Sequence, residues 1–276
     1  MTLSVNTNTG AMTALQYLNN TQASMSVTQN AISTGLKVAS AKDDGAIYAI
    51  AQNMRGQVSS YTAVTDSLNR GMSAVDVGMS AGQSISDLLI QMKTKALSAS
   101  DTSLDTASRT ALDNDFKALR DQIDTIAKNA SFNGFNLLSG DTTKISALST
   151  TDGSGHIDVN AQTMALGKGA LTGVTSSSAI DTRTNASAMV GKLQSALTNV
   201  NASLAKLSAG SKQYSIQLSF ANKLSDAVTS GIGNLVDANL ATESAKLTSL
   251  QTKQQLGVQA LSIANSAPQM VLSLFQ

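Results

Sequence analysis

Residues 193–228 read LQSALTNVNASLAKLSAGSKQYSIQLSFANKLSDAV and carry the longest heptad pattern in the chain. Positions three and four residues apart are mostly apolar: Leu193, Leu197, Val200, Leu204, Leu207, Ser211, Tyr214, Leu218, Ala221, Leu224 and Val228. Apolar side chains that repeat every ~3.5 residues form a narrow stripe, which a second helix must cover. We therefore predict a coiled-coil helix over residues 184–235, which would span about 75–80 Å.

Three further stretches have the same spacing and predict partners for this helix. The first runs from Leu15 to Leu36, the second covers residues 44–99, and the third covers residues 108–129. The second stretch is about the right length to lie against the 184–235 helix, and the third would pack along part of the same rod. Asp105 and Ser108 are both suited to cap the third helix at its N-terminus, because their side-chain oxygens can accept from free backbone amides.

Residues 139–181 differ in composition from the helical stretches and are rich in Ser, Thr, Gly and Asp. Short β-capable pieces at residues 144–148, 156–159 and 171–174 are separated by turn signals such as Asp152-Gly153. We predict that they form a small β-rich region that caps one end of the helical rod.

The composition favours a polymer subunit over a globular enzyme. Aromatic residues make up 3%, Trp is absent, and Pro268 is the single proline, which suits long helices packed closely side by side. Charged residues make up 13% and the formal net charge is +1, so no nucleic-acid partner is expected. A weakly charged surface gives little protection against self-association, which a polymer requires.

No catalytic, cofactor or metal site is expected. Cys is absent and His156 is the single histidine, so neither a thiolate metal site nor a His-based nucleophile can be built. The acidic pair Asp43 and Asp44 is interpreted as the start of a helix, where carboxylates interact favourably with the helix dipole. Residues 169–173 lack the Lys-Ser/Thr ending of a phosphate loop. The sequence therefore predicts a structural protein and not an enzyme.

The two ends of the chain have features of their own. The N-terminal residues MTLSVNTNTGAMTAL lack the basic and apolar regions of a secretory signal peptide. No apolar run reaches about 18 residues, so no membrane span is predicted. The heptads of both ends are diluted by polar residues such as Gln22 and Gln254. Because isolated helices need tertiary burial of their apolar face, we predict that both ends fold on assembly.

Three sequence motifs resemble those of bacterial flagellins. The first is SAKDD at residues 40–44, followed by AIA at 49–51, and the second is SFNGFNLLSG at 131–140. The third comprises ATES at 241–244, QQ at 254–255 and ANSAPQMVLSLF at 264–275. The motifs occur in the family's order and include both ends of the chain. The pattern is most similar to minimal flagellins of α-proteobacteria.

The resemblance implies a mainly α fold, a long antiparallel helical coiled-coil rod formed by both chain ends with a small β-hairpin region in the middle of the sequence. Residues 1–43 and 236–276 would form an inner coiled-coil layer, and residues 44–138 and 182–235 an outer helical rod. Residues 139–181 would form the β-hairpin and turn region of that rod. This middle is too short for the extra surface domains of larger flagellins.

The resemblance also implies the function, a structural subunit that polymerises into the bacterial flagellar filament for swimming motility. The expected location is extracellular, after export through the flagellar type III apparatus without a cleaved signal peptide. The expected partners are further copies of this chain, sister flagellins, the flagellar cap and hook-junction proteins, and the export apparatus with its chaperone. A hook–filament junction protein and a secreted adhesin or binding module are the alternative interpretations.

Two sets of residues are assigned to these roles. The residues expected to pack in the seams or at assembly contacts are Leu15, Leu18, Met25, Ile32, Ile50, Met54, Leu68, Leu204, Leu218, Val228, Leu250, Leu261 and Leu272. The candidate O-glycosylation sites on the outer surface are Thr172, Thr175, Ser176, Ser177 and Ser178.

Residues 89–99, LIQMKTKALSA, depart from one pattern of the family. Flagellins that the vertebrate innate receptor senses resemble one another in an Arg- and Glu-bearing patch, and Gln91 and Thr94 stand where those residues are expected. We therefore predict weak recognition by that receptor.

Overall fold

The computed structural model describes the backbone of residues 7–273 and the side chains of residues 7–266. Its helices are α1 (Thr9–Thr34), α2 (Gly45–Ala99), α3 (Thr106–Asn129), α4 (Arg183–Val236) and α5 (Leu240–Ser273). Between α3 and α4 lie β1 (Ser131–Phe132), β2 (Phe135–Asn136), β3 (Lys144–Leu148), β4 (His156–Asn160) and the 3₁₀ helix η1 (Gly169–Leu171). The chain divides into two compact units, unit 1 with residues 1–56 and 227–276 and unit 2 with residues 57–226.

The long helices have nearly the extents that the heptads predict. α2 and α4 begin and end within one residue of 44–99 and 184–235. The predicted start of α2 at Asp44 is confirmed, because Asp44 Oδ1 accepts from the amides of Ala46 and Ile47 at 3.0 and 2.9 Å. Asp105 caps α3 by accepting from the amide of Ser108 at 2.7 Å, whereas Ser108 itself lies inside the helix. The mainly α fold is confirmed.

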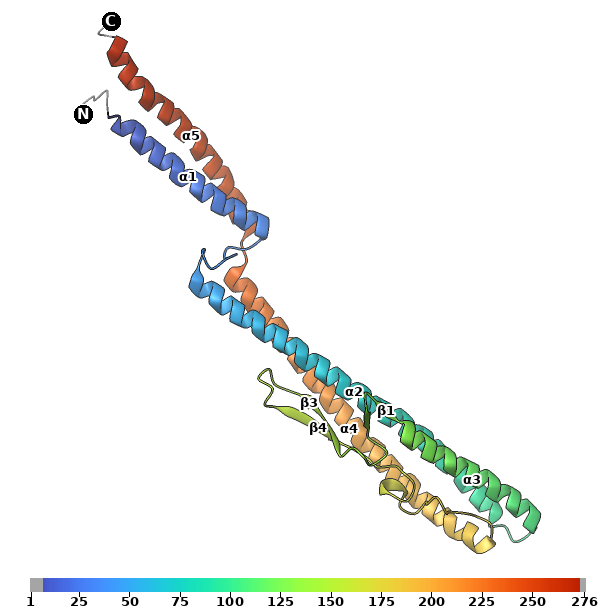
Figure 1. Cartoon of the computed structure of the whole chain (residues 1–276). Coiled ribbons are helices and arrows are strands. Elements are labelled where there is room, and N and C mark those ends of the chain that lie inside the picture. The colour runs from blue at the N-terminus through green and yellow to red at the C-terminus, as the bar shows by residue number, and fades with distance from the viewer. Residues whose placement is uncertain (1–6, 274–276) are drawn as a thin grey trace. The chain divides into compact units, whose positions relative to one another are not determined.

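Unit 1 is built on the antiparallel pair of α1 and α5, which come from opposite ends of the chain (Figure 1). Asn8 caps α1, and its Nδ2 donates to the carbonyl of Ala264 at 2.7 Å. Further along the pair, Gln254 Nε2 donates to Gln22 Oε1 at 2.8 Å. The polar residues that dilute these heptads therefore lie on the seam and bond across it.

The segment between α1 and α2 packs on the chain between α4 and α5 within unit 1. Gly35 ends α1 with a φ of 72°, which glycine adopts without the strain that a Cβ would cause. Its carbonyl accepts from the amide of Ala238 at 2.8 Å. A small separate core is centred on Val38, Ala51 and Val236. These contacts hold both connections together where the α1–α5 pair ends.

Unit 2 contains the continuous hydrophobic core, between α3 and the parts of α2 and α4 that belong to this unit. α2 and α4 are antiparallel, since Lys93 Nζ donates to Gln194 Oε1 and Gly71 lies against the ring of Tyr214. Leu68, Met92, Phe116, Leu207 and Tyr214 are among the fully buried side chains. The heptad positions of α2 and α4 therefore meet as the coiled-coil prediction requires.

The antiparallel β3–β4 hairpin corrects the expected place of the β-rich region. It lies alongside α2 and α4 instead of capping an end of the rod (Figure 1). Ser67 of α2 accepts from the amide of Leu148 at 3.0 Å, and Gln217 of α4 donates to the carbonyl of Ser149 at 3.0 Å. The prediction was wrong because heptad spacing identifies helix partners and says nothing about where a hairpin docks.

The third expected strand, at residues 171–174, is also wrong. The chain there forms η1 and a following turn. Gly169 has a φ of 52°, and a Cβ on it would lie 2.1 Å from the carbonyl oxygen of Thr163. The amide of Ala170 donates to that same oxygen at 2.9 Å, so the segment closes back on residue 163 instead of extending.

Candidate assembly surfaces

The described residues form neither a metal-ligand cluster nor a membrane-spanning helix. None of their His, Asp and Glu side chains form a group of three or more that could hold a metal ion. None of the helices in the described part of the chain is long and apolar enough to cross a membrane. The features that remain to be explained are exposed apolar side chains on the helices.

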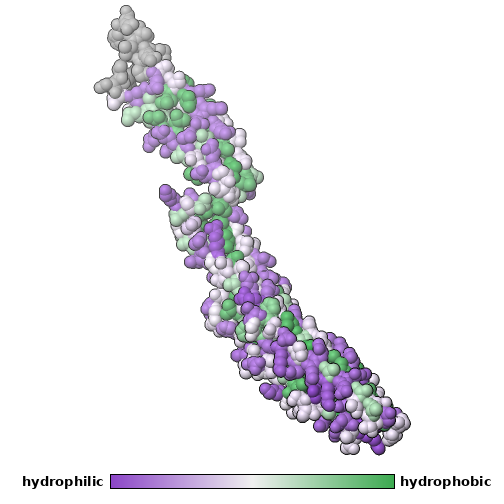
Figure 2. Space-filling view, turned by 45° about the vertical axis from the view of Figure 1, so that its right-hand side comes forward, coloured by the Kyte–Doolittle hydropathy of each residue, from purple (hydrophilic) through white to green (hydrophobic). Residues whose placement is uncertain are grey.

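Unit 1 exposes many large apolar side chains for its size. They are Met12, Leu15, Tyr17, Val27, Ile50, Leu240, Leu256, Val258 and Ile263, each 47–70% exposed. Figure 2 shows hydrophobic residues reaching the surface of the α1–α5 pair on the face that it draws. Two helices can bury one seam only, so every apolar residue off that seam stays in water. Clustered exposure of this extent is typical of a surface that other protein covers.

The seam of unit 1 holds most of the residues expected there. Met25 and Leu250 are buried. The half-buried residues are Leu18, Ile32, Met54, Val228 and Leu261. Leu15 and Ile50 are instead 47% and 51% exposed, because their heptad positions face away from the partner helix. Leu272 lies outside the residues whose side chains are described.

In unit 2, the seam residues and the surface residues separate clearly. Leu68 is fully buried, while Leu204 and Leu218 are half-buried and pack against the core. Large apolar side chains that do not fit the heptads are exposed on α2 and α4: Ile90, Leu97, Ile216 and Phe220. Heptad spacing does not identify these four as candidate contact residues. Their departure from the 3.5-residue spacing was the available signal.

The carboxylates that precede α2 form hydrogen bonds in the turn and at the start of the helix. Asp43 accepts from the amide and the hydroxyl of Ser40, at 2.8 and 3.1 Å, and from the amide of Ala39 at 3.1 Å. These hydrogen bonds, first the one from the Ser40 amide, hold the pKa of Asp43 below its usual value. The SAKDD motif therefore fixes the turn that leads into α2.

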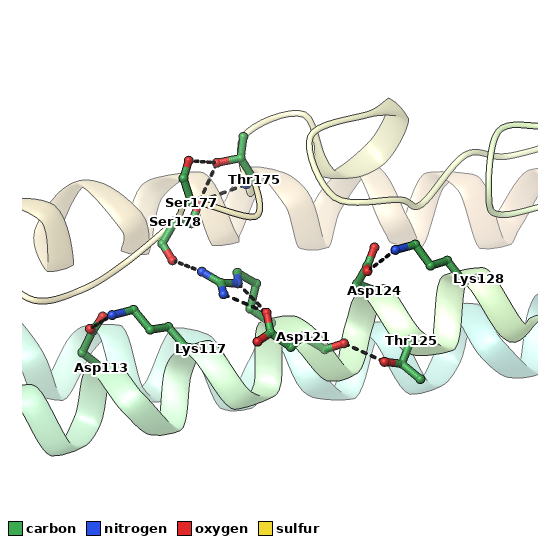
Figure 3. Close-up of polar contacts among 10 residues, drawn as sticks. Asp113, Lys117, Asp121, Asp124, Thr125, Lys128, Thr175, Ser177 and Ser178 are labelled. Atoms are coloured by element: carbon green, nitrogen blue, oxygen red, sulfur yellow. Dashed lines mark hydrogen bonds and ion pairs between the residues drawn. The ribbon is translucent and has the colours of Figure 1, made fainter.

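Side chains of α3 fasten the segment that leads to α4 (Figure 3). Asp113 is buried, accepts from the amide of Ile180 at 2.7 Å and pairs with Lys117 at 2.6 Å. Arg120 donates to the carbonyl of Ser178 at 2.9 Å and pairs with Asp121 at 2.7 Å. Residues 178–180 are therefore held against α3 by one buried carboxylate and one guanidinium, neither of which the heptads indicate.

The same contacts distinguish the buried from the exposed candidate glycosylation sites. Ser178 is buried, and its hydroxyl accepts from the amide of Thr175 at 2.9 Å, so it is not accessible for modification. Thr172, Thr175, Ser176 and Ser177 are exposed. Four of the five candidate hydroxyls are therefore accessible.

The family models match the two helical parts of the chain. Residues 5–143 match the bacterial flagellin N-terminal helical region, and residues 190–275 match the bacterial flagellin C-terminal helical region. The chain belongs to the bacterial flagellin family. Flagellin FljK of Caulobacter vibrioides is 52% identical to this flagellin over 273 residues, 99% of this chain and 98% of that protein. A flagellin of Brucella melitensis is 37% identical over 287 residues, 99% of each chain.

These relatives confirm the resemblance to flagellins of α-proteobacteria. In structure, a putative flagellar hook-associated protein from Vibrio parahaemolyticus is similar with a TM-score of 0.59, covering 71% of this chain and 100% of that chain. Its sequence identity is 15%, so this likeness shows the fold alone. This flagellin is a structural subunit of the bacterial flagellar filament, which serves motility.

Proposed function

We propose that this flagellin builds its filament in two layers. Residues 1–43 and 236–276 form the inner coiled-coil layer, and residues 44–138 and 182–235 form the outer helical rod. Residues 139–181 are part of the outer layer, and no further surface domain covers them. The filament surface is then the bare rod.

The observation that carries this proposal is the exposed apolar surface of α1 and α5. Nine large apolar side chains of unit 1 are about half exposed or more, while its buried seam includes a Thr28 hydroxyl with no partner among the described residues. Burying one such side chain contributes about 1.5–3 kcal/mol. Packing several copies of this pair together therefore supplies stabilisation that the isolated pair lacks, and both ends fold fully on assembly.

We propose the partners of assembly and export from what the family resemblance implies. The main partner is another copy of this chain, with sister flagellins able to enter the same filament. Cap and hook-junction proteins contact the ends of the filament, and a chaperone escorts the chain to the flagellar export apparatus. Export through that apparatus places the protein outside the cell without cleavage of a signal peptide.

We also propose that the exposed hydroxyls of residues 172–177 carry O-linked glycans on the outer surface. Thr172, Thr175, Ser176 and Ser177 are accessible on one short segment of unit 2. Intact-mass measurement on isolated filaments is expected to give a mass above that of the unmodified chain. A mass equal to the bare chain would remove this proposal and leave the two-layer assembly unaffected.

Assembly is tested by polymerisation of the purified full-length chain. After addition of ammonium sulfate or of short filament seeds, negative-stain microscopy is expected to show straight or helical fibres. The same chain without precipitant or seeds is the control. Amorphous aggregate as the sole product would contradict the proposal.

A further inference from the structure

One exposed stripe on α4 combines apolar and basic side chains. Its members share one side of the helix and are called the basic stripe: Ala209, Lys212, Gln213, Ile216, Phe220 and Lys223. Ile216 is 61% exposed and Phe220 is 52% exposed. Neither lysine forms an ion pair with any of the described residues.

The basic stripe is hollowed where it borders β4. An open hollow of ≈ 440 Å³ is lined by Ile157 of the hairpin and by residues of α4 from Ala209 to Gln217. An apolar side chain from another molecule can enter this hollow, while Lys212 lines its edge. Because nothing in unit 2 covers Ile216 or Phe220, the surface has the apolar centre and charged rim of a contact site.

A second exposed stripe, on α2, combines apolar side chains with the opposite charge. Its members are called the acidic stripe: Asp87, Ile90, Gln91, Thr94 and Leu97, continued by Asp101 just beyond the helix. Ile90 is 49% exposed and Leu97 is 60% exposed. The two lysines near it, Lys93 and Lys95, are engaged by Gln194 and Asp115 of the same chain.

We propose that the basic stripe of one copy of this flagellin packs on the acidic stripe of a second copy. Each stripe has two large apolar side chains flanked by charged residues. The charges are positive on the basic stripe and negative on the acidic stripe. Apolar contact then covers Ile216 and Phe220 with Ile90 and Leu97, while Lys212 and Lys223 lie near Asp87 and Asp101. Complementary rims of this kind fix the register of a contact and exclude wrong pairings. This inference rests on the proposed assembly and names one of its contacts.

The position of the two stripes within unit 2 favours a growing polymer over a closed dimer. Residue 93 of α2 lies beside residue 194 of α4, and residue 71 lies beside residue 214. In this register, the centre of the basic stripe at Ile216 lies beside about residue 70 of α2, whereas the acidic stripe is centred near residue 92. The stripes are thus offset by about 30 Å along the helices, from ~1.5 Å per residue. A contact between two different patches can repeat from copy to copy, and it builds an open helical assembly when the rotation between copies does not close into a ring.

Charge reversal tests the contact. The double variant Lys212→Asp/Lys223→Asp and the single variant Asp87→Lys are each expected to lower the pelleted polymer at low ionic strength about tenfold, because like charges then meet across the contact. Combining all three changes in one chain is expected to raise the polymer above the level of the double variant, because Asp87→Lys restores one pair of opposite charges while Asp101 still meets an acidic side chain. The matched control is Lys168→Asp/Lys192→Asp, which alters net charge as much as the double variant does, at exposed residues outside both stripes.

The outcomes separate this contact from the proposed function as a whole. Circular dichroism establishes that each variant is helical before assembly. If the wild type and all variants polymerise alike, or if the triple variant is no better than the double, the contact is overturned and filament formation stands. If the wild type forms no filaments under any seeding condition, the proposed function fails and the contact fails with it.

Disulfide cross-linking tests the contact independently of charge. The natural chain has no cysteine, so only introduced cysteines can form the bond. In filaments of Ile90→Cys/Ile216→Cys, mild oxidation is expected to give a ladder of covalent multimers between copies. A disulfide needs Cα atoms about 4.4–6.8 Å apart, so the ~30 Å offset forbids the bond within one chain. Ile90→Cys/Asn222→Cys, with the second cysteine about 120° further around α4, is expected to give little ladder. Equal ladders from both pairs would overturn the contact.

Discussion

Tyr214 joins the helices of unit 2 to the β3–β4 hairpin through a single side chain. Its ring is fully buried against Gly71, and its hydroxyl donates to the carbonyl of Ile145 at 2.9 Å. Tyr214→Phe keeps the ring and removes this donor, so we expect the free energy of unfolding to fall by about 1 kcal/mol. Urea unfolding followed by circular dichroism measures the change. Tyr17→Phe, at a residue 68% exposed on α1, is the matched control and is expected to alter stability by less than about 0.5 kcal/mol.

The pKa of Tyr214 also determines how the free energy of unfolding changes at alkaline pH. Burial, and then the charge of Asp158, raise the pKa of Tyr214 to about 12. In the unfolded chain a tyrosine loses its proton near pH 10, so the unfolded state releases the proton first as pH rises. Stability from the neutral hydroxyl is therefore complete below about pH 10 and declines between about pH 10 and 12. Unfolding at about pH 9 and 11 should show a larger decline for the wild type than for Tyr214→Phe. Equal declines would contradict the assigned pKa.

At the scale of elements, two of the glycines inside α4 have opposite surroundings. A Cβ on Gly191 would meet nothing within 4 Å, whereas a Cβ on Gly210 would lie 2.6 Å from Val159 Cγ1 of β4. Gly191→Ala is expected to stabilise the protein by about 0.5–1 kcal/mol, because alanine favours the helix. Gly210→Ala is expected to destabilise it by about 1–3 kcal/mol, because β4 must move away from α4. Urea unfolding of both variants measures the two changes in the free energy of unfolding within the same helix.

A third variant tests the cause of that difference. Shortening the opposing side chain in Gly210→Ala/Val159→Ala removes the atoms that the new Cβ would meet. The double variant should therefore be less destabilised than the sum of the two single changes. Strict additivity would mean that the hairpin does not press on α4 at this residue.

How much of each element the sequence predicts depends on the kind of interaction that forms it. Heptads predict α2 and α4 to within one residue because a helix seam depends on local spacing. The sequence could not place the hairpin, because its position depends on long-range hydrogen bonds, one accepted by Ser67 and one donated by Gln217. The expected strand at residues 171–174 failed because the φ of Gly169 and the carbonyl of Thr163 turn the chain. Spacing identifies most of the residues that face a partner helix, although Leu15 and Ile50 are exposed. It does not indicate what packs on exposed residues such as Ile216 and Leu97.

At the scale of the whole molecule, the two units bury their apolar residues to different degrees. Unit 2 has one continuous core around fully buried side chains such as Phe116 and Leu207, whereas unit 1 leaves nine large apolar residues exposed. Unit 2 therefore has the contacts to remain folded without help, and unit 1 depends on other copies for burial. Because of this difference, two-layer assembly is best tested by asking whether unit 2 stays folded when unit 1 cannot form.

Removal of residues 240–276 deletes α5 and leaves α1 without its partner helix. We expect unit 2 to stay folded, because its core contains no residue of α5, and we expect no filaments even with seeds. Circular dichroism should retain a cooperative thermal transition, limited proteolysis should leave residues 57–226 protected, and negative-stain microscopy should show no fibres. The full-length chain under the same seeding is the control. Fibres from the truncated chain would refute the inner layer, and loss of the protected fragment would show that unit 2 does not fold independently.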